Sequence, residues 1–414
     1  MISDNAKYWI WIVSALGYDN IKVKRLYELY TDISEFYDGG EREWRFCGIL
    51  SQREFEKLSE TSIDNSQNVI DRCKQLNYSI ICIDDTLFPN CLRNIEDPPA
   101  LIYVNGHLPN LDNRLTIGVV GTRRATKYGL ENSYKIAYAL AKYGVTIISG
   151  GALGVDCASH RGALACDGVT VCVRGCGINC DYLRDNMQMR NSITKRGAVI
   201  SEYPPDETPR NYYFPQRNRI ISALSDGLLV IEAGAKSGSL ITANLALEQG
   251  KEVFALLGNN SPQNEGSNNR IKEGTAIPIT DFMDILNHFD NLYATNGDVD
   301  FDEISFEDIE AIPVKGKAAL AKTNYNDTKK VKVRKVKFET VKPESKPVHK
   351  ENLNLNTTAQ MVYQYITNEP VHIDKISADL QIPVYKVLTA LTELEMKQLI
   401  QAHQGRLYTL KNGG

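Results

Sequence analysis

The sequence predicts an α/β fold built on a doubly wound parallel sheet, with a helical domain before the sheet and a winged helix after it. Three patterns support this. Short apolar runs alternate with amphipathic segments between residues 78 and 290, apolar residues recur at helical spacing in residues 1–75, and a helix-turn-helix pattern lies within residues 356–411. A chain of 414 residues that is 43% hydrophobic has enough core material for two to four such domains.

The first 75 residues predict a small helical domain. Segments 21–38 and 53–76 place apolar residues three and four positions apart, which is the spacing of an amphipathic helix.

Residues 78–290 predict the sheet domain. Alternation of short β-rich runs with helical patterns is typical of parallel strands joined by crossover helices. Ala-rich helices are expected to end at glycines after amphipathic runs, as the segments 156–168 and 239–250 do. The expected strands are 79–84, 115–121, 145–150, 169–173, 198–202, 227–233 and 252–258.

Residues 291–355 predict a flexible basic linker. Between Val314 and Lys350 the chain has eleven Lys and one Arg against three acidic residues, and few large apolar side chains. Such a composition cannot bury a core. A solvated tether is the simpler interpretation, and a tether that also holds phosphate weakly is the alternative.

The winged helix is predicted from a helix-turn-helix over 373–400 and a hairpin over 400–410 with Gly405 at its tip. A helix-turn-helix can place its second helix in the major groove of DNA. Here that helix has Lys386 and Lys397 against Glu393 and Glu395. This balance favours contact with a protein, with a vestigial DNA-binding module as the alternative.

Several classes of protein are disfavoured. No apolar stretch approaches the roughly 18–20 residues of a membrane span, and the first residues lack the basic start of a secretory signal. Nine cysteines at irregular spacing are expected as reduced thiols in the cytoplasm. Cys172, Cys176 and Cys180 lack a second ligand pair, so we expect buried thiols there, and no metal or cofactor.

Four segments are expected at the carboxyl ends of the strands, where open parallel sheets bind ligands. The first, 121–129, begins with Gly121, Thr122 and Arg123, which offer close backbone approach, a hydroxyl and a guanidinium. The second, 149–156, contains three glycines but neither a dinucleotide fingerprint nor a phosphate loop. Asp156 and His160 begin its helix; they are interpreted as bonding each other or capping the helix, with a catalytic pair as the minor alternative.

The third segment places Arg217, Asn218 and Arg219 at a helix start marked by Pro215. Cations are unfavourable at this end of a helix, by about 0.3–1 kcal/mol each, so a compensating anion is expected: a ligand phosphate, or a carboxylate such as Glu202 or Glu232. Phe214 is either a stacking platform for a base or a hydrophobic staple. The fourth segment opens a helix with free N–H groups and hydroxyls, suited to an anion, at Lys236, Ser237, Gly238 and Ser239.

Taken together, these motifs resemble the DprA/Smf family of bacterial DNA-processing proteins. The resemblance covers about residues 80–280 and rests on an ordered series, "GVVGTRRATKYG", "SGGALGVDCASHRGAL", "GCGINCDY", "ISEYPP", "FPQRNRIISALSD", "VIEAGAKSGSLITANLALEQGKEVFAL" and "EGSNNRIKEGTA". It implies an extended Rossmann-like domain, flanked by a SAM-like helical domain and a winged helix.

The resemblance also implies the function. It implies a non-enzymatic, cytoplasmic, homodimeric protein that binds and protects incoming single-stranded DNA and loads the RecA recombinase during natural transformation. Many members have Arg where this chain has Leu153, and a Tyr-Pro pair is here Tyr182-Leu183; both departures leave the contact loops intact. The DNA-binding residues expected on this basis are Gly121, Thr122, Arg123, Arg210, Phe214, Arg217, Asn218, Arg219, Lys236, Ser237, Gly238 and Ser239.

Two other functions are weighed. Related Rossmann-like phosphoribohydrolases carry a Pro-Gly-Gly-x-Gly-Thr core followed by a Glu, which "EAGAKSGSLITA" lacks, so the carboxylate needed for glycosidic chemistry is missing. A duplex-DNA regulator acting through the winged helix is the other, and a preference for single over double strands would discriminate against it.

Overall fold

The computed structural model describes residues 1–18, 20–289, 312–315, 357–368, 370–380, 382, 384–397, 399–403 and 407–411. The chain divides into two compact units, Met1–Asn324 and Tyr325–Gly414, and each is described by itself. In the described part of the chain, no helix has the length and apolar character needed to cross a membrane.

The first unit begins with six short helices, as the spacing of apolar residues predicts. Their interior is aromatic: the rings of Trp11 and Trp44 lie 5.2 Å apart, and Phe36 is fully buried between the same helices. These side chains belong to the same hydrophobic cluster as the sheet, so the helices and the sheet share one core. The helices are α1 (Ala6–Leu16), α2 (Lys22–Leu29), α3 (Ile33–Asp38), α4 (Gly40–Phe46), α5 (Gln52–Glu60) and α6 (Asp64–Leu76).

A nine-stranded sheet forms the centre of the unit, in the order β1-β2-β6-β5-β4-β3-β7-β8-β9. The strands from β6 to β9 are parallel, whereas β2 pairs antiparallel with both β1 and β6. The strands are β1 (Ser79–Cys82), β2 (Leu101–Gly106), β3 (Thr116–Val120), β4 (Thr146–Ser149), β5 (Thr170–Arg174), β6 (Ala198–Ser201), β7 (Gly227–Val230), β8 (Glu252–Leu256) and β9 (Ile277–Ile279).

All seven expected strands are present, and the mostly parallel sheet is confirmed. At one edge of the sheet, β2 runs antiparallel to both of its neighbours. Strands β2 and β9 were not predicted. β9 has only three residues and contains Pro278, which is tolerated at an edge strand where one side needs no ladder hydrogen bond.

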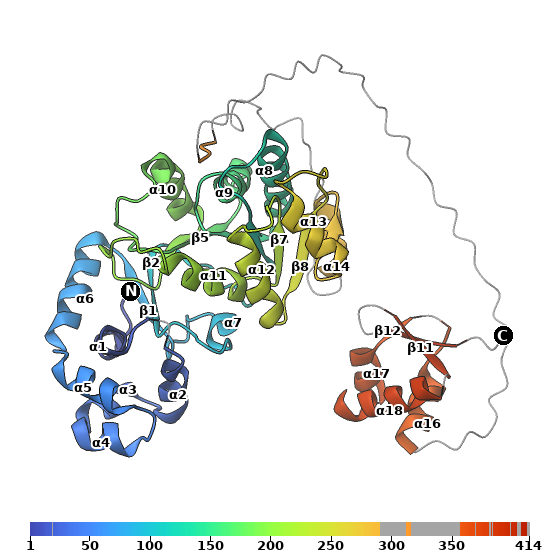
Figure 1. The fold of residues 1–414 in the computed structure, drawn as a ribbon. Helices are drawn as coiled ribbons and strands as arrows, with labels where there is room; N and C mark the ends of the chain where they lie inside the picture. The colour runs from blue at the N-terminus through green and yellow to red at the C-terminus, as the bar shows by residue number, and fades with distance from the viewer. Residues whose placement is uncertain are drawn as a thin grey trace, which may run out of the picture. The chain divides into compact units, whose positions relative to one another are not determined.

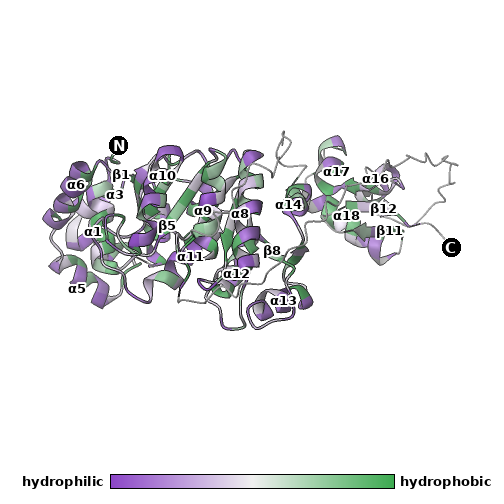
Figure 2. Ribbon diagram, turned by 90° about the horizontal axis from the view of Figure 1, so that it is seen from above, coloured by the Kyte–Doolittle hydropathy of each residue, from purple (hydrophilic) through white to green (hydrophobic). Residues whose placement is uncertain are grey.

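Helices cover both faces of the sheet (Figure 1). Helices α8 (Lys127–Lys142), α9 (Val155–Ala165) and α10 (Met187–Arg196) line one face, and α11 (Tyr213–Ala223) and α12 (Ser239–Glu248) line the other. Figure 2 shows apolar strands between helices whose outer sides are hydrophilic, which is the pattern of a sheet buried on both faces. The remaining helical elements are α7 (Asn90–Arg93), η1 (Arg184–Asn186), α13 (Glu265–Lys272) and α14 (Phe282–Phe289).

The order of the strands reverses at β3, which lies between β4 and β7. Chain connections on either side of this point go to opposite faces, so the loops after β3, β4 and β7 diverge and leave a crevice at the carboxyl ends of the strands. The predicted binding segments follow these strands.

The second unit is a winged helix, as predicted. Helices α16 (Thr357–Tyr365), α17 (Ile373–Leu380) and α18 (Val384–Met396) pack around a core that includes Val362, Ile376 and Leu391. A three-stranded antiparallel sheet completes it, in the order β10-β12-β11, with β10 (Val371–His372), β11 (Ile400–His403) and β12 (Leu407–Leu410). Gly405, expected at the tip of the wing, lies outside the described residues.

Most of the expected basic linker, 291–355, also lies outside the described residues. The exception is Ile312–Lys315, drawn in orange in Figure 1. Ile312 is 5% exposed and belongs to the core of the first unit, and Val314 packs partly against that core. The linker prediction is therefore wrong for these four residues, because they dock on the sheet domain.

Candidate nucleic-acid interface

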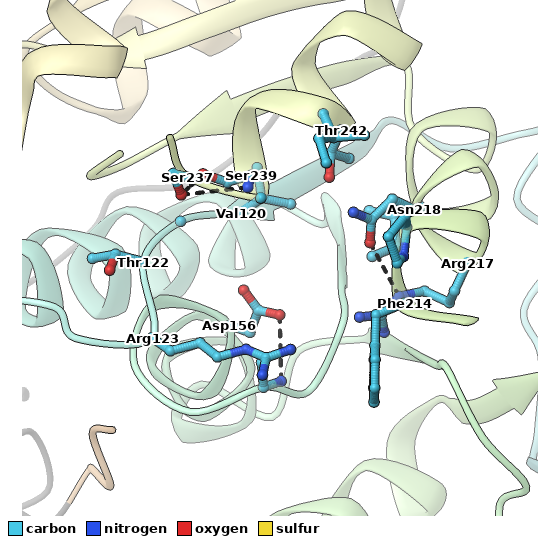
Figure 3. Close-up of a pocket in the computed structure, with 16 residues that line it drawn as sticks. Val120, Thr122, Arg123, Asp156, Phe214, Arg217, Asn218, Ser237, Ser239 and Thr242 are labelled. Carbon is cyan, nitrogen blue, oxygen red and sulfur yellow. Dashed lines mark hydrogen bonds between the residues drawn. The ribbon is translucent and has the colours of Figure 1, made fainter. Parts of the chain in front are cut away.

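A cavity of about 280 Å³ opens at the carboxyl ends of β3 and β7. Figure 3 shows side chains from four segments converging on it. The loop after β3 contributes Arg123, α9 contributes Asp156, α11 contributes Phe214 and Arg217, and the start of α12 contributes Ser237 and Ser239. The sequence prediction that these segments meet at one edge of the sheet is borne out by this geometry.

The loop after β3 approaches α9 too closely for any residue but glycine at position 121. A Cβ on Gly121 would lie 2.6 Å from a methyl group of Val155. The next residue is fixed by its backbone, because the N–H of Thr122 donates to the carbonyl of Glu232 at 2.8 Å. Arg123 then extends over the cavity, with its guanidinium carbon 5.5 Å from the centre of the Phe214 ring. This is the geometry of a cation–π contact.

Glu232, at the end of β7, organises the start of α8. It is almost fully buried, and its two carboxylate oxygens accept hydrogen bonds from the Thr126 N–H at 2.9 Å and the Thr126 hydroxyl at 2.6 Å. Gly129 leaves room for this carboxylate, since a Cβ there would lie 2.3 Å from it. Among the residues that the structure describes, Glu232 makes no ion pair with an arginine; it ties the loop after β7 to the loop that carries Arg123.

Phe214 is half-buried and forms part of the wall of the cavity. Its ring centre lies 5.3 Å from that of Tyr182 and 5.5 Å from the guanidinium carbon of Arg123. Helix α11 begins at Tyr213, so Phe214 is inside the helix and its ring contacts belong to other segments. These contacts disfavour the staple interpretation, and stacking of a base on Phe214 stays a prediction.

Arg217 lines the cavity but is only 5% exposed. It donates hydrogen bonds to the carbonyls of Gly150, at 2.8 Å, and Val173. A Cβ at Gly150 would come within 2.6 Å of the guanidinium, so this loop needs glycine to accept Arg217. Burial lowers the pKa of Arg217, and the nearby Asp156 opposes that shift. Arg217 therefore links β5 to the loop after β4 through its hydrogen bonds, and it also lines the cavity.

Arg219 does not reach the cavity, and its assignment to the DNA-binding set is corrected. It is 3% exposed and makes ion pairs with Glu202, at 2.6 Å, and Asp97, at 3.0 Å. Burial alone would lower its pKa, but the two carboxylates raise it overall. The anion that compensates this cation at the start of α11 is thus a protein carboxylate, Glu202, which was one of the alternatives.

The start of α12 forms the opposite wall of the cavity. The hydroxyls of Ser237 and Ser239 lie 2.8 Å apart, and Gly238 between them faces open space. Asn218 also lines the cavity, and its side-chain oxygen accepts from Arg217 at 3.3 Å. Two hydroxyls and a flexible backbone at a helix start provide hydrogen-bond donors for an anion.

Two predicted cations lie outside this cavity. Lys236 is exposed on the loop just before Ser237 and does not line the cavity. Arg210 is exposed and pairs with Glu207 at 3.3 Å, while it donates to the Tyr212 hydroxyl at 3.0 Å. The structure thus brings together nine of the twelve predicted residues and separates Arg210, Arg219 and Lys236 from them.

Comparison with known proteins identifies the family. Residues 79–290 match the model of DNA recombination-mediator protein A, which is more than half of the chain, and residues 347–406 match the DprA winged helix domain. The chain belongs to the DprA/Smf family.

Among curated relatives, Protein Smf of Escherichia coli K12 is 42% identical over 215 residues, which is 51% of this chain and 57% of that protein. DNA processing protein DprA of Bacillus subtilis 168 is 40% identical over 185 residues, 45% of this chain and 62% of that protein. The aligned part of the chain therefore spans less than two thirds of either relative. An X-ray structure of DNA processing protein A from Streptococcus pneumoniae superposes with a TM-score of 0.58 at 29% identity, over 68% of this chain and 97% of that one.

Asp156 also lines the cavity. The sequence predicted this residue at a helix start and did not assign it to the site. It is 8% exposed and accepts a hydrogen bond from the Ala152 N–H at 3.3 Å. Burial raises its pKa, and Arg217 opposes the rise. In this DprA/Smf chain, then, an acid lies inside the predicted anion site, and its charge is balanced by Arg217.

Asp156 and His160 do not form a pair. The His160 ring is fully buried, and its Nδ1 lies 2.7 Å from the Thr170 hydroxyl. Burial, followed by the charge of Arg217, lowers the pKa of His160 to about 3, so the ring is neutral at physiological pH. The mutual-bond interpretation of this pair is wrong, because the Asp156 carboxylate bonds the turn before α9 and the His160 ring bonds Thr170.

Cys172, in β5, and Cys176 and Cys180, after it, are free thiols, and the first two are buried. The guanidinium of Arg174 lies 3.0 Å from the Cys176 sulfur and donates to the Cys180 carbonyl at 3.0 Å. Within the described ranges, no group of three or more His, Cys, Asp and Glu side chains is arranged to hold a metal ion.

Proposed function

We propose that the chain binds single-stranded DNA at the cavity between Arg123, Phe214 and the start of α12. The observation that carries the proposal is the placement of the Arg123 guanidinium 5.5 Å over the Phe214 ring, opposite two serine hydroxyls. A phosphate would bind Arg123 and the hydroxyls, and the adjoining base would stack at Phe214. Stacking of a base on an aromatic side chain contributes about 1–3 kcal/mol and accepts any base.

The size of the cavity favours a single strand. Its volume of about 280 Å³ is near the lower end of small-ligand sites, at roughly 300–1,000 Å³. That is room for part of one nucleotide at a time, and a base must leave its duplex stack before it can meet Phe214. Because the chain carries a net charge of −4, attraction of DNA depends on the local cations and not on the overall charge.

Family membership supports a proposal for the wider role. As a DprA/Smf protein, the chain would protect incoming single-stranded DNA and load RecA onto it during natural transformation, acting as a homodimer in the cytoplasm. Nine free thiols support a reducing compartment. For the winged helix we favour contact with a protein, since Lys397 of the second helix is paired with Glu393 at 3.1 Å and so offers less charge to a DNA groove.

Binding without catalysis is part of the proposal. Among the described residues that line the cavity, Asp156 is the one carboxylate, and it is held by the Ala152 N–H beside Arg217. Incubation with nucleoside monophosphates, followed by chromatography, is expected to release no free base. Release of base that disappears in an Asp156→Asn variant would instead establish a hydrolase.

Oligonucleotide binding tests the proposal. The anisotropy of labelled oligo-dT and of a duplex of equal length would be measured across a salt series, for the native chain and for Arg123→Ala. Loss of one phosphate contact is expected to reduce the salt slope for a single strand by about 0.7. Lys74→Ala, at an exposed residue of α6, is the matched charge control. Equal slopes for Arg123→Ala and the native chain, or tighter binding of the duplex, would refute the proposal.

A further inference from the structure

Four residues late in the first unit, Ile312–Lys315, are hydrogen-bonded to loops of the proposed DNA site. Helix α14 ends at Phe289 and α16 begins at Thr357, and between them the structure describes Ile312–Lys315. Ile312 is anchored in the core of the first unit. Because Ile312 is held in this core, the residues that follow it, Pro313 to Lys315, lie against the sheet domain.

Two backbone hydrogen bonds join this segment to the loops of the site. The carbonyl of Pro313 accepts from the Gly154 N–H at 2.9 Å, and the N–H of Lys315 donates to the carbonyl of Arg123 at 2.8 Å. The two bonds hold the segment to the loop after β4, through Gly154, and to the loop after β3, through Arg123.

The two loops are also bound to each other. The Val155 N–H donates to the carbonyl of Thr122 at 3.3 Å. Gly154 has φ of +76°, and a Cβ there would lie 2.5 Å from the Thr122 carbonyl, so only glycine permits this approach. Three stretches of backbone thus meet at Arg123: its own loop, the loop after β4, and Ile312–Lys315.

We propose that Ile312–Lys315 is a clip that positions Arg123 for DNA. The inference rests on the proposed function, because the clip holds the backbone from which the Arg123 side chain extends over Phe214. Without the hydrogen bond from the Lys315 N–H, the Arg123 carbonyl loses its partner in this segment. The backbone that carries the Arg123 guanidinium is then held less firmly.

A pair of substitutions at one position isolates the backbone bond. Lys315→Ala removes the charge and keeps the N–H, whereas Lys315→Pro removes both. Proline also disfavours helical backbone in the residue before it, here Val314. Losing one hydrogen bond is expected to make oligo-dT binding by Lys315→Pro about three- to tenfold weaker than by Lys315→Ala. Thermal unfolding of both full-length variants would establish that they are folded.

A double-mutant cycle with Arg123→Ala distinguishes lost positioning of Arg123 from a general loss of structure. If the clip acts through Arg123, Lys315→Pro has no further effect on affinity when Arg123 is already Ala, whereas independent effects would add. Equal affinity of the Pro and Ala variants, additive effects in the cycle, or tighter binding by Lys315→Pro would each overturn the clip. Failure of Arg123→Ala itself to weaken binding would instead refute the proposed function.

Discussion

The buried pair of Arg219 and Glu202 gives a prediction that separates a structural role from DNA contact. In Glu202→Gln, one acceptor oxygen is replaced by an NH₂ group that faces a guanidinium donor. The native pair is bidentate, with distances of 3.0 and 2.6 Å, and both side chains are less than 5% exposed. Removing one partner of a buried pair costs about 3–5 kcal/mol. Asp97 still pairs with Arg219, so we expect a loss at or just below the lower end of this range, about 2–3 kcal/mol.

The free energy of unfolding in urea, followed by tryptophan fluorescence, measures this cost. Asp97→Asn is the matched control: the Asp97 side chain is 38% exposed, and partly solvated ion pairs contribute only about 0–1 kcal/mol. At a temperature where Glu202→Gln is fully folded, its affinity for oligo-dT and its salt slope should equal those of the native chain. A loss of stability below about 0.5 kcal/mol, or a changed salt slope, would refute the structural assignment of Arg219.

Three further predictions concern the loops around the site. Gly121→Ala places a methyl group 2.6 Å from Val155. We expect the free energy of unfolding in urea to fall by about 1–3 kcal/mol and oligo-dT binding to weaken. Unchanged stability would show that the loop can move aside. Glu232→Gln removes one of the acceptors that hold Thr126, and about 1–3 kcal/mol is expected from the donor left unpaired, measured as a shift in urea midpoint at constant slope. The pKa of His160, held near 3 in the folded chain, lies below its unfolded value, so the unfolded state takes up a proton first and stability falls as pH drops from about 6.5 toward 3. This loss should approach about 1.4 kcal/mol per pH unit in unfolding experiments, and an equal acid sensitivity in His160→Gln would contradict it.

The sequence predicted the sheet well because its buried strands are continuous apolar runs. Strand β2 was overlooked although it is as well buried as the others, since it follows a proline-rich turn and was not separated from the loop around it. Ile312–Lys315 could not be found, because four residues show no periodicity. The docking of Ile312 depends on a pocket in the core that only the folded unit provides.

Within the site, the sequence predicted which loops come together but not which arginines are paired with carboxylates. Residues two apart on a helix point about 200° apart, so Arg217 and Arg219 cannot share one face of α11. Helix geometry alone therefore excludes placing both in the cavity, although it does not say which one faces it. The choice is made by Glu202, which the sequence offered as one possible partner, and by Asp97, which it did not.

The three arginines expected to bind phosphate end in three environments, and this ranks their value to a ligand. Arg219 is neutralised by carboxylates, and Arg217 has two backbone carbonyls and the charge of Asp156 beside it. Arg123 is the most exposed of them, and its described side-chain contact is with an aromatic ring. A guanidinium against an aromatic face keeps its donors available, since that face accepts charge without taking the N–H groups in its plane. Recognition of phosphate should therefore depend more on Arg123 than on the other two, and on whatever holds its backbone in place.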